Sequence, residues 1–245
     1  MPQNIYDDAQ FFAGYSKLPR STRGLDGAPE WPALRALLPT LHGLRVLDLG
    51  CGFGWFCRYA RTAGAASVTG LDVSEQMLAR AREQTNDGAI SYLRADLEQQ
   101  LTLAPAAFDL AYSSLALHYI ENLTGLLAQV HAALVPGATF IFSVEHPIYT
   151  APRNPGWVSD AEGGRTWPVD GYCDEGARST DWLAKGVIKQ HRTIATYFTL
   201  LRQAGFAVSH IDEWAPTQAQ IAAQPELAVE RERPAFLIVA CCRDE

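Results

Sequence analysis

Short apolar segments alternate with helical segments along most of this chain, and that alternation limits the folds it can adopt. The expected strands are residues 45–49, 67–71, 90–93, 108–113 and 139–144, followed by two more at 206–214 and 235–242. The expected helices are residues 55–63, 75–84, 123–134 and 193–204. Strands that alternate with helices form parallel sheets covered on both faces. We therefore predict an α/β protein with a doubly wound, Rossmann-like sheet of seven strands that is mostly parallel.

Two regions fall outside the alternation. Residues 1–43 form a predicted helical lead-in, in which Trp31, Leu34 and Leu37 recur at helical spacing. Residues 145–190 are rich in Gly, Pro, Asp and Trp and show no clear period. A segment this long without a period is usually functional. We therefore predict that it forms a cap inserted into a domain spanning residues 44–245.

The composition narrows the class of function. The chain has 245 residues, a net charge of −7 and scattered Lys and Arg residues, so we expect no nucleic-acid partner. Its apolar runs are far shorter than a membrane span, and residues 1–12 lack the apolar core of a signal peptide.

The five cysteines contain no CxxC pair, which favours free thiols in the cytoplasm. The histidines lack the spacing of a metal site, so we predict none. The oligomeric state stays open.

The most informative segment is the loop Asp48-Leu49-Gly50-Cys51-Gly52-Phe53-Gly54, which follows the first expected strand. Its glycines let the backbone turn sharply and approach a ligand closely. Asp72 ends the second expected strand, where a carboxylate can accept hydrogen bonds from both ribose hydroxyls. Together these features indicate an adenosine-containing ligand. Trp55 occupies the third glycine position of the dinucleotide fingerprint, and Asp48 would repel a pyrophosphate but suits an amino-acid ammonium.

These motifs resemble class I S-adenosylmethionine-dependent methyltransferases, specifically the ubiquinone/menaquinone-biosynthesis-like (type 11) branch. The loop at 48–54 resembles motif I, residues 71–74 the motif after the second strand, and residues 95–97 the acidic loop near adenine. Residues 108–119 and 134–137 resemble motif IV and the turn before the fifth strand. The resemblance implies an antiparallel last strand, with S-adenosylmethionine as methyl donor and S-adenosylhomocysteine as product. The implied cofactor-binding residues are Tyr15, Asp48, Gly50, Cys51, Gly52, Asp72, Val73, Met77, Ala95, Asp96, Leu97 and Ser113.

The acceptor is expected beyond the carboxyl ends of the fourth and fifth strands, where open α/β sheets bind ligands. His118 and His146 follow these strands and are candidate general bases, because imidazole titrates near neutral pH. Candidate substrate-binding residues are Tyr119, Trp157, Trp182 and His191. We predict methyl transfer to an O, N or C atom of a small molecule.

Two other classes of function stay open at this point. One is a dinucleotide-dependent oxidoreductase, against which Trp55 and Asp48 argue. The other is a non-catalytic module that only binds S-adenosylmethionine, against which the histidines of the acceptor side argue.

Overall fold

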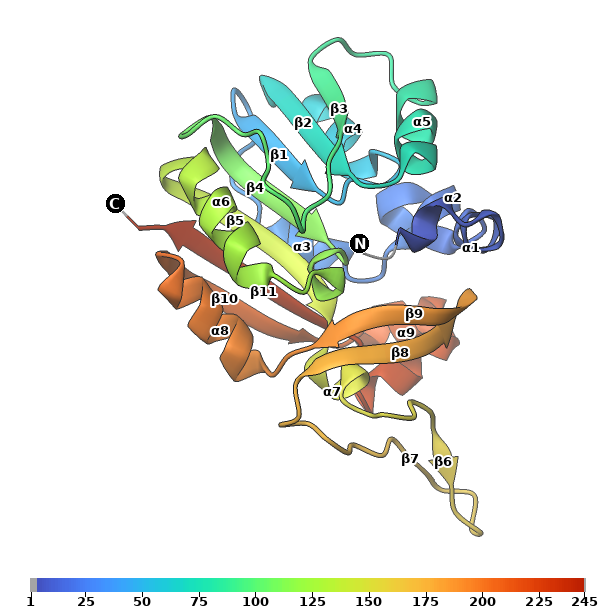
Figure 1. The fold of residues 1–245 in the computed structure, drawn as a ribbon. Coiled ribbons are helices and arrows are strands. Elements are labelled where there is room, and N and C mark those ends of the chain that lie inside the picture. The colour runs from blue at the N-terminus through green and yellow to red at the C-terminus, as the bar shows by residue number, and fades with distance from the viewer. Residues whose placement is uncertain (1–3, 245) are drawn as a thin grey trace.

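The computed structural model, which describes residues 4–244, is built around a seven-stranded sheet in the order β3-β2-β1-β4-β5-β11-β10 (Figure 1). The strands are β1 (Arg45–Leu49), β2 (Ser67–Asp72), β3 (Ile90–Arg94), β4 (Phe108–Ser114), β5 (Leu134–Glu145), β10 (Phe206–Trp214) and β11 (Phe236–Arg243). Strand β11 pairs antiparallel with both β5 and β10, and the other pairs are parallel. The predicted fold class, with its antiparallel last strand, is confirmed.

Helices cover both faces of the sheet, as the alternating sequence predicts. One face carries α3 (Trp31–Leu37), α4 (Trp55–Thr62) and α5 (Glu75–Glu83), and the other carries α6 (Leu123–Ala133) and α8 (Ile194–Gln203). Strand β5 contributes to both cores. Phe140 and Phe142 pack towards α6 and α8, whereas Ile141 packs towards α3 and α4. Alternate side chains of a strand point to opposite faces, so a sheet covered on both sides needs a continuous apolar run.

The strand β5 begins earlier than the sequence predicts. Pro136 and Gly137 were expected to form a turn before the strand, but both lie within it. The register against β4 shifts there, because Phe108 pairs with Leu134 and Leu110 pairs with Thr139. Gly137 has φ of +76°, so these residues form an irregularity inside the ladder instead of a turn outside it.

The described part of the lead-in, residues 4–43, consists of short helical pieces. They are η1 (Ile5–Asp7), α1 (Ala9–Tyr15), α2 (Pro19–Thr22), η2 (Gly24–Gly27) and α3. Asp8 caps α1 by accepting a hydrogen bond from the Phe11 amide at 2.9 Å. The Ser74 hydroxyl donates to the Asp7 carboxylate at 2.5 Å. This bond ties the segment to the start of α5, next to the carboxyl end of β2.

The segment between β5 and α8 has secondary structure that the sequence did not reveal. It contains α7 (Pro147–Thr150) and two hairpins, β6 (Val158–Ser159) with β7 (Arg165–Thr166) and β8 (Gly176–Trp182) with β9 (Ala184–His191). Strand β9 places Lys189 and His191 in buried positions where an apolar side chain is usual. These polar residues break the apolar alternation by which a half-buried strand is recognised.

The remaining elements are η3 (Leu117–Tyr119) after β4, and α9 (Gln218–Ala223) and η4 (Pro225–Arg231) before β11. The arrowheads of β1, β4 and β5 point towards the space between the N-terminal helices and the hairpin β8–β9 (Figure 1). Among residues 4–244, no helix is both long and apolar enough to cross a membrane.

The two-sided core leads to a stability prediction. Leu110 lies on the central strand β4 and is fully buried, so Leu110→Ala should lower the free energy of unfolding by about 2–5 kcal/mol. The matched control is Leu93→Ala on the edge strand β3, where half of the side chain is exposed and the cost should be below about 1 kcal/mol. Urea denaturation measures both values. Equal losses would contradict this description of the core.

Candidate active site

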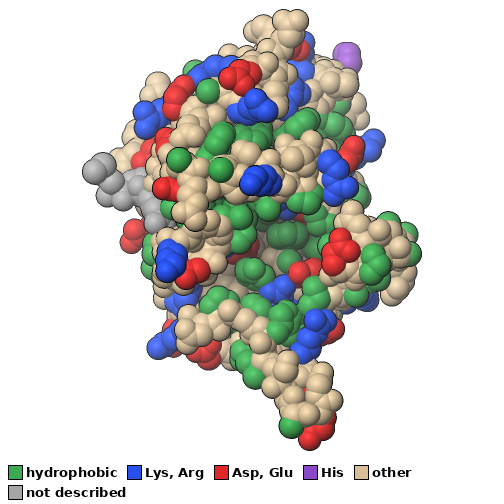
Figure 2. All heavy atoms as spheres, turned by 90° about the vertical axis from the view of Figure 1, so that its right-hand side faces the viewer, with side chains coloured by type: hydrophobic (Ala, Val, Ile, Leu, Met, Phe, Trp, Pro, Cys, Tyr) green, Lys and Arg blue, Asp and Glu red, His purple; other side chains and the backbone are tan. Residues whose placement is uncertain are grey.

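One cavity of about 530 Å³ opens at the carboxyl ends of the parallel strands. Figure 2 shows it as a hollow in the middle of one face, lined mainly by hydrophobic side chains with a few charged ones. The sequence-predicted residues that line it are Tyr15, Gly50, Gly52, Asp72, Val73, Met77, Asp96, Leu97, His118, Tyr119 and Trp182. The loops after β1, β2, β3 and β4 therefore meet in a single space, as an open α/β sheet requires.

The glycine loop is shaped by two different constraints. Gly50 has φ of +74°, and a Cβ there would lie 2.4 Å from the Ala116 Cβ, so the fold itself requires glycine. Gly52 has φ of +51°, but a Cβ there would meet no atom within 4 Å. The open space beside Gly52 belongs to the cavity, where a ligand can approach the backbone closely.

Asp72 is held at the end of β2 by backbone amides. Its Oδ2 accepts a hydrogen bond from the Gly52 amide and its Oδ1 accepts one from the Ser74 amide, both at 2.9 Å. Burial raises the pKa of this carboxyl to about 6, although the two amide bonds act in the opposite direction. Each carboxylate oxygen keeps lone pairs for a further donor, such as the two hydroxyls of a ribose.

A second, smaller cavity of about 90 Å³ adjoins the first along the glycine loop. Tyr15, Arg20, Gly50 and Gly52 line both cavities. Arg20 forms a 3.1 Å ion pair with the fully buried carboxylate of Glu30.

Asp48 and Cys51 line the smaller cavity but not the larger one. Asp48 accepts a hydrogen bond from the Cys57 thiol at 3.2 Å, and burial raises the pKa of its carboxyl to about 7. The lining of the smaller cavity thus includes a carboxyl group and a guanidinium, which suit the ammonium and carboxylate of an amino-acid tail.

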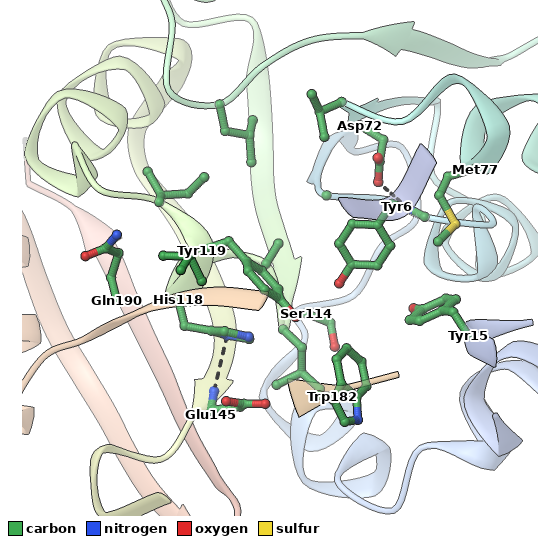
Figure 3. A pocket seen from close by; sticks show the side chains of 18 of the residues that line it. Tyr6, Tyr15, Asp72, Met77, Ser114, His118, Tyr119, Glu145, Trp182 and Gln190 are labelled. Carbon is green, nitrogen blue, oxygen red and sulfur yellow. Dashed lines mark hydrogen bonds between the residues drawn. The ribbon is translucent and has the colours of Figure 1, made fainter. Parts of the chain in front are cut away.

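Aromatic rings from three parts of the chain close over the cavity. The Tyr6 ring lies 5.4 Å from that of Tyr15 and 5.9 Å from that of Tyr119, between centroids. The Tyr15 and Trp182 ring centroids are 6.5 Å apart. Figure 3 shows these four rings around the middle of the cavity, with Asp72 and Met77 on one side of it. The lead-in and the hairpin β8–β9 thus meet across the site.

Polar side chains gather at the end of the cavity that lies opposite Asp72. His118 accepts a hydrogen bond at Nδ1 from the Glu145 amide at 3.3 Å. Burial holds the pKa of His118 well below its usual value, and the charges of Lys189, Arg192 and Arg20 act in the same direction. The Lys189 ammonium donates to the Glu145 carboxylate at 2.5 Å.

Two predicted histidines lie outside the cavity lining. His146 is buried, its Nε2 lies 2.9 Å from a Glu213 carboxylate oxygen, and its Nδ1 accepts a hydrogen bond from the Ile148 amide at 3.0 Å. His191 pairs at Nδ1 with the Thr150 hydroxyl at 2.8 Å and at Nε2 with a backbone carbonyl. Both ring nitrogens of each residue are therefore engaged with protein groups.

Three other predicted residues also lie outside the lining of either cavity. Trp157 packs against Trp167, with ring centroids 5.5 Å apart. The Ala95 amide donates to the backbone of Asp72 at 2.9 Å. The Ser113 hydroxyl donates to a backbone carbonyl of β1 at 2.8 Å, while the next residue along β4 lines the cavity.

Sequence reasoning did not select Tyr6, Glu145 or Arg233 as site residues, although all three line the cavity. Tyr6 lies in the lead-in, outside every motif described above. Glu145 ends β5, so its position alone could have identified it. Arg233 precedes β11, which runs antiparallel to β5 and therefore begins where β5 ends. A residue just before the antiparallel strand is thus delivered to the same edge of the sheet, and topology could have found it.

Comparison with known proteins agrees with this geometry. Residues 47–142 match a family described as a methyltransferase domain. The crystal structure of an S-adenosylmethionine-dependent methyltransferase from Mesorhizobium loti is 61% identical, covers 90% of this chain and 100% of that chain, and has a TM-score of 0.87. The chain belongs to the S-adenosylmethionine-dependent methyltransferases. This confirms the predicted enzyme class and methyl donor, and it excludes the dinucleotide alternative.

The relatives of this methyltransferase differ in the share of its length that they match. An uncharacterized protein from Haemophilus influenzae is 35% identical over 217 residues, covering 86% of this chain and 85% of the relative. Malonyl-acyl-carrier protein O-methyltransferase from Pectobacterium atrosepticum is 44% identical over 110 residues, which is 45% of this chain and 42% of that enzyme. The second similarity spans less than half of either protein.

The Asp72 geometry leads to a binding prediction. Asp72→Ala should weaken the binding of S-adenosylhomocysteine by about 1.5–3 kcal/mol, because the hydrogen bonds of a charged acceptor are lost. Isothermal calorimetry measures the change. Asp109→Ala serves as the control, because Asp109 pairs with Arg45 at the opposite edge of the sheet. An unchanged affinity in a folded Asp72 variant would contradict the assignment.

Asp48 leads to a prediction about pH. Its pKa rises from 3.8 to about 7 in the fold, so between these values the folded state keeps a proton that the unfolded chain releases. The contribution of this group to stability therefore falls as pH rises through that window. Asp48→Asn should stabilise the ligand-free protein at pH 8 by about 1–3 kcal/mol and flatten its pH dependence. Thermal unfolding at pH 6 and pH 8 tests this, and a variant that is less stable at pH 8 would contradict it.

Proposed function

We propose that the methyltransferase acts on a small-molecule acceptor held in the 530 Å³ cavity. One observation carries the proposal: members of both expected sets line the same cavity, among them Asp72 and Met77 for the methyl donor and Tyr119 and Trp182 for the acceptor. Its volume lies within the range of small-molecule sites, which is about 300–1,000 Å³.

The residues present fit the methyl donor. Asp72 would accept hydrogen bonds from the ribose hydroxyls, Asp96 would accept from the adenine amino group, and Met77 would pack on the adenine ring. Asp48 and Arg20, which line the smaller cavity, would bind the ammonium and carboxylate of the amino-acid tail. When bound, S-adenosylmethionine supplies an activated methyl group on a sulfonium centre.

The acceptor side has its own set of residues. His118, Tyr119 and Trp182 line the cavity and would contact the acceptor, with the Tyr6 and Tyr15 rings excluding water above it. Holding an acceptor in line with the methyl group can supply about 7–11 kcal/mol of the barrier. His146, His191 and Trp157 would act on the shape of the cap, because their contacts are with protein groups.

Several features favour a small acceptor over a macromolecule. Aromatic rings surround the middle of the cavity (Figure 3), and the net charge of −7 opposes binding to a phosphate backbone. The O-methyltransferase relative matches less than half of this chain, so its acceptor is not carried over to this protein. We place the activity in the cytoplasm, which is supported by the five free thiols.

The experiment that tests this function follows a labelled methyl group from S-adenosylmethionine into a metabolite extract from which macromolecules have been removed. We expect label in a small molecule. Label that enters only the protein fraction of a whole lysate would contradict a small acceptor. Binding of the donor without turnover on any fraction would favour the non-catalytic module.

Substitution of Trp182 tests whether this residue acts on the acceptor or on the methyl donor. Trp182→Ala should lower turnover about 10- to 100-fold, because a misplaced acceptor loses alignment, while the affinity for S-adenosylhomocysteine changes less than about threefold. Trp182→Phe should recover part of the activity, and Val158→Ala on the exposed hairpin β6–β7 should behave as wild type. Equal losses of donor affinity and turnover would place Trp182 in the donor site instead.

A further inference from the structure

The tautomer of His118 is set by the backbone of the neighbouring strand. The Glu145 amide at the end of β5 donates to His118 Nδ1 at 3.3 Å. A neutral imidazole has one donor and one acceptor nitrogen, so accepting at Nδ1 places the proton on Nε2. His118 therefore has an N–H to offer at its other nitrogen.

The Nε2 atom points into the cavity. His118 is 2% exposed and lines the cavity, and Figure 3 shows its ring extending from the Glu145 amide towards the space beside Trp182. Within residues 4–244, no group forms a hydrogen bond with His118 Nε2. The atom is not one of the fully buried polar atoms that lack a partner in this range, so it is accessible from the cavity. This N–H is thus directed at whatever occupies the acceptor side.

Three cations act on His118. Burial holds its pKa well below the usual value, and the cations of Lys189, Arg192 and Arg20 lower the pKa further. Lys189 is paired with Glu145 and Arg20 with Glu30.

Arg192 differs from the other two cations. It is buried and donates to the backbone carbonyls of Ile120 and Glu121, and within residues 4–244 it has no ion pair. Its Nη1 is buried without a partner in the same range. A buried cation without an ion pair leaves a positive potential, which favours an anion nearby.

We propose that the acceptor is a carboxylic acid whose carboxylate accepts a hydrogen bond from His118 Nε2–H and is methylated on oxygen. This inference rests on the proposed function and names the class of acceptor. One carboxylate oxygen forms a bond to the methyl carbon as the bond between that carbon and sulfur breaks. The electron pair of the broken bond goes to sulfur, the negative charge on the acceptor and the positive charge on sulfur cancel, and the product is a methyl ester.

This step requires no general base, which agrees with the state of His118. A carboxylate is already ionised at neutral pH, so no proton has to leave. A protonated amine would have to lose a proton, and Nδ1 of His118 is already occupied by the Glu145 amide. Burial raises the pKa of the Tyr119 phenol far above neutral. Lys189 binds one oxygen of the Glu145 carboxylate, and the other oxygen is buried without a partner among residues 4–244.

The first test reads the tautomer directly. Nitrogen NMR on protein labelled with ¹⁵N-histidine and saturated with S-adenosylhomocysteine should show His118 neutral, with its proton on Nε2, from about pH 6 to pH 9. His118→Gln assigns the signal by its loss. A proton on Nδ1, or a titration between pH 6 and pH 8, would overturn the proposal.

The second test uses the smallest carboxylate and a matched cation as probes. Sodium acetate should shift the His118 Nε2–H resonance of the same complex, whereas methylammonium chloride at equal ionic strength should not. Gln places an amide N–H near the position of Nε2, so His118→Gln should retain acetate binding within about threefold while His118→Ala weakens it about tenfold or more. His210→Gln, at an exposed position on β10, should match the wild type.

The outcomes separate this inference from the proposed function. If S-adenosylhomocysteine binds by calorimetry but acetate causes no shift, or methylammonium causes the larger one, the carboxylate proposal is wrong and the methyltransferase function stands. If S-adenosylhomocysteine does not bind, the proposed function itself fails. Label from S-adenosylmethionine that is released from its product as methanol by mild alkali, as expected of a methyl ester, supports the proposal, and alkali-stable label overturns it.

Discussion

The hydrogen bonds that join the end of β1 to the end of β2 hold the donor site together. The Gly50 and Cys51 amides both donate to the Leu71 carbonyl, at 2.8 and 2.9 Å. One residue further along the chain on each side, the Gly52 amide donates to the Asp72 carboxylate. The turn of the glycine loop, the direction of the Asp72 carboxylate and the open space beside Gly52 all depend on this junction. It forms only if β1 and β2 pair in their observed parallel register.

The same junction concentrates negative charge in a buried place. Burial raises the pKa of Asp48 to about 7 and that of Asp72 to about 6, and the charge of Asp72 adds to the shift at Asp48. Ionising both carboxyls therefore costs free energy in the ligand-free fold. A ligand that brought an ammonium and two hydroxyls would offset that cost, so the carboxyls that destabilise the ligand-free fold would favour such a ligand. Residues kept in an unfavourable state by the fold are expected at functional sites.

The part of the chain that obeys regular periodicity could be predicted from sequence, and the part that depends on long-range pairing could not. The strands 45–49 and 206–214 were predicted with their observed bounds, because apolar runs between turns define them locally. The hairpin β8–β9 was missed because Lys189 and His191 fill buried positions through an ion pair and hydrogen bonds to distant residues. The sequence placed His118 and His146 equally well after their strands. Only the fold shows that His118 lines the cavity while His146 caps α7.

The hydrogen-bond donor Nε2–H of His118 is held in place by the sheet, whereas most of the rings around the cavity come from other segments. Strands β4 and β5 pair with Ser114 opposite Ser143, so the loop after β4 lies against the end of β5. The group that orients His118 is therefore a backbone amide of the sheet, which no side-chain substitution removes. Three of the rings around the cavity belong to the lead-in and to the hairpin β8–β9, whose side chains contact the sheet and its loops, for example Asp7 with Ser74 and Lys189 with Glu145. Changes in those segments can alter the size and shape of the acceptor while the hydrogen bond offered at Nε2 keeps its place. Under the proposed assignment, the sheet would set the chemistry of the methylated group, and the lead-in and hairpin would select the rest of the acceptor.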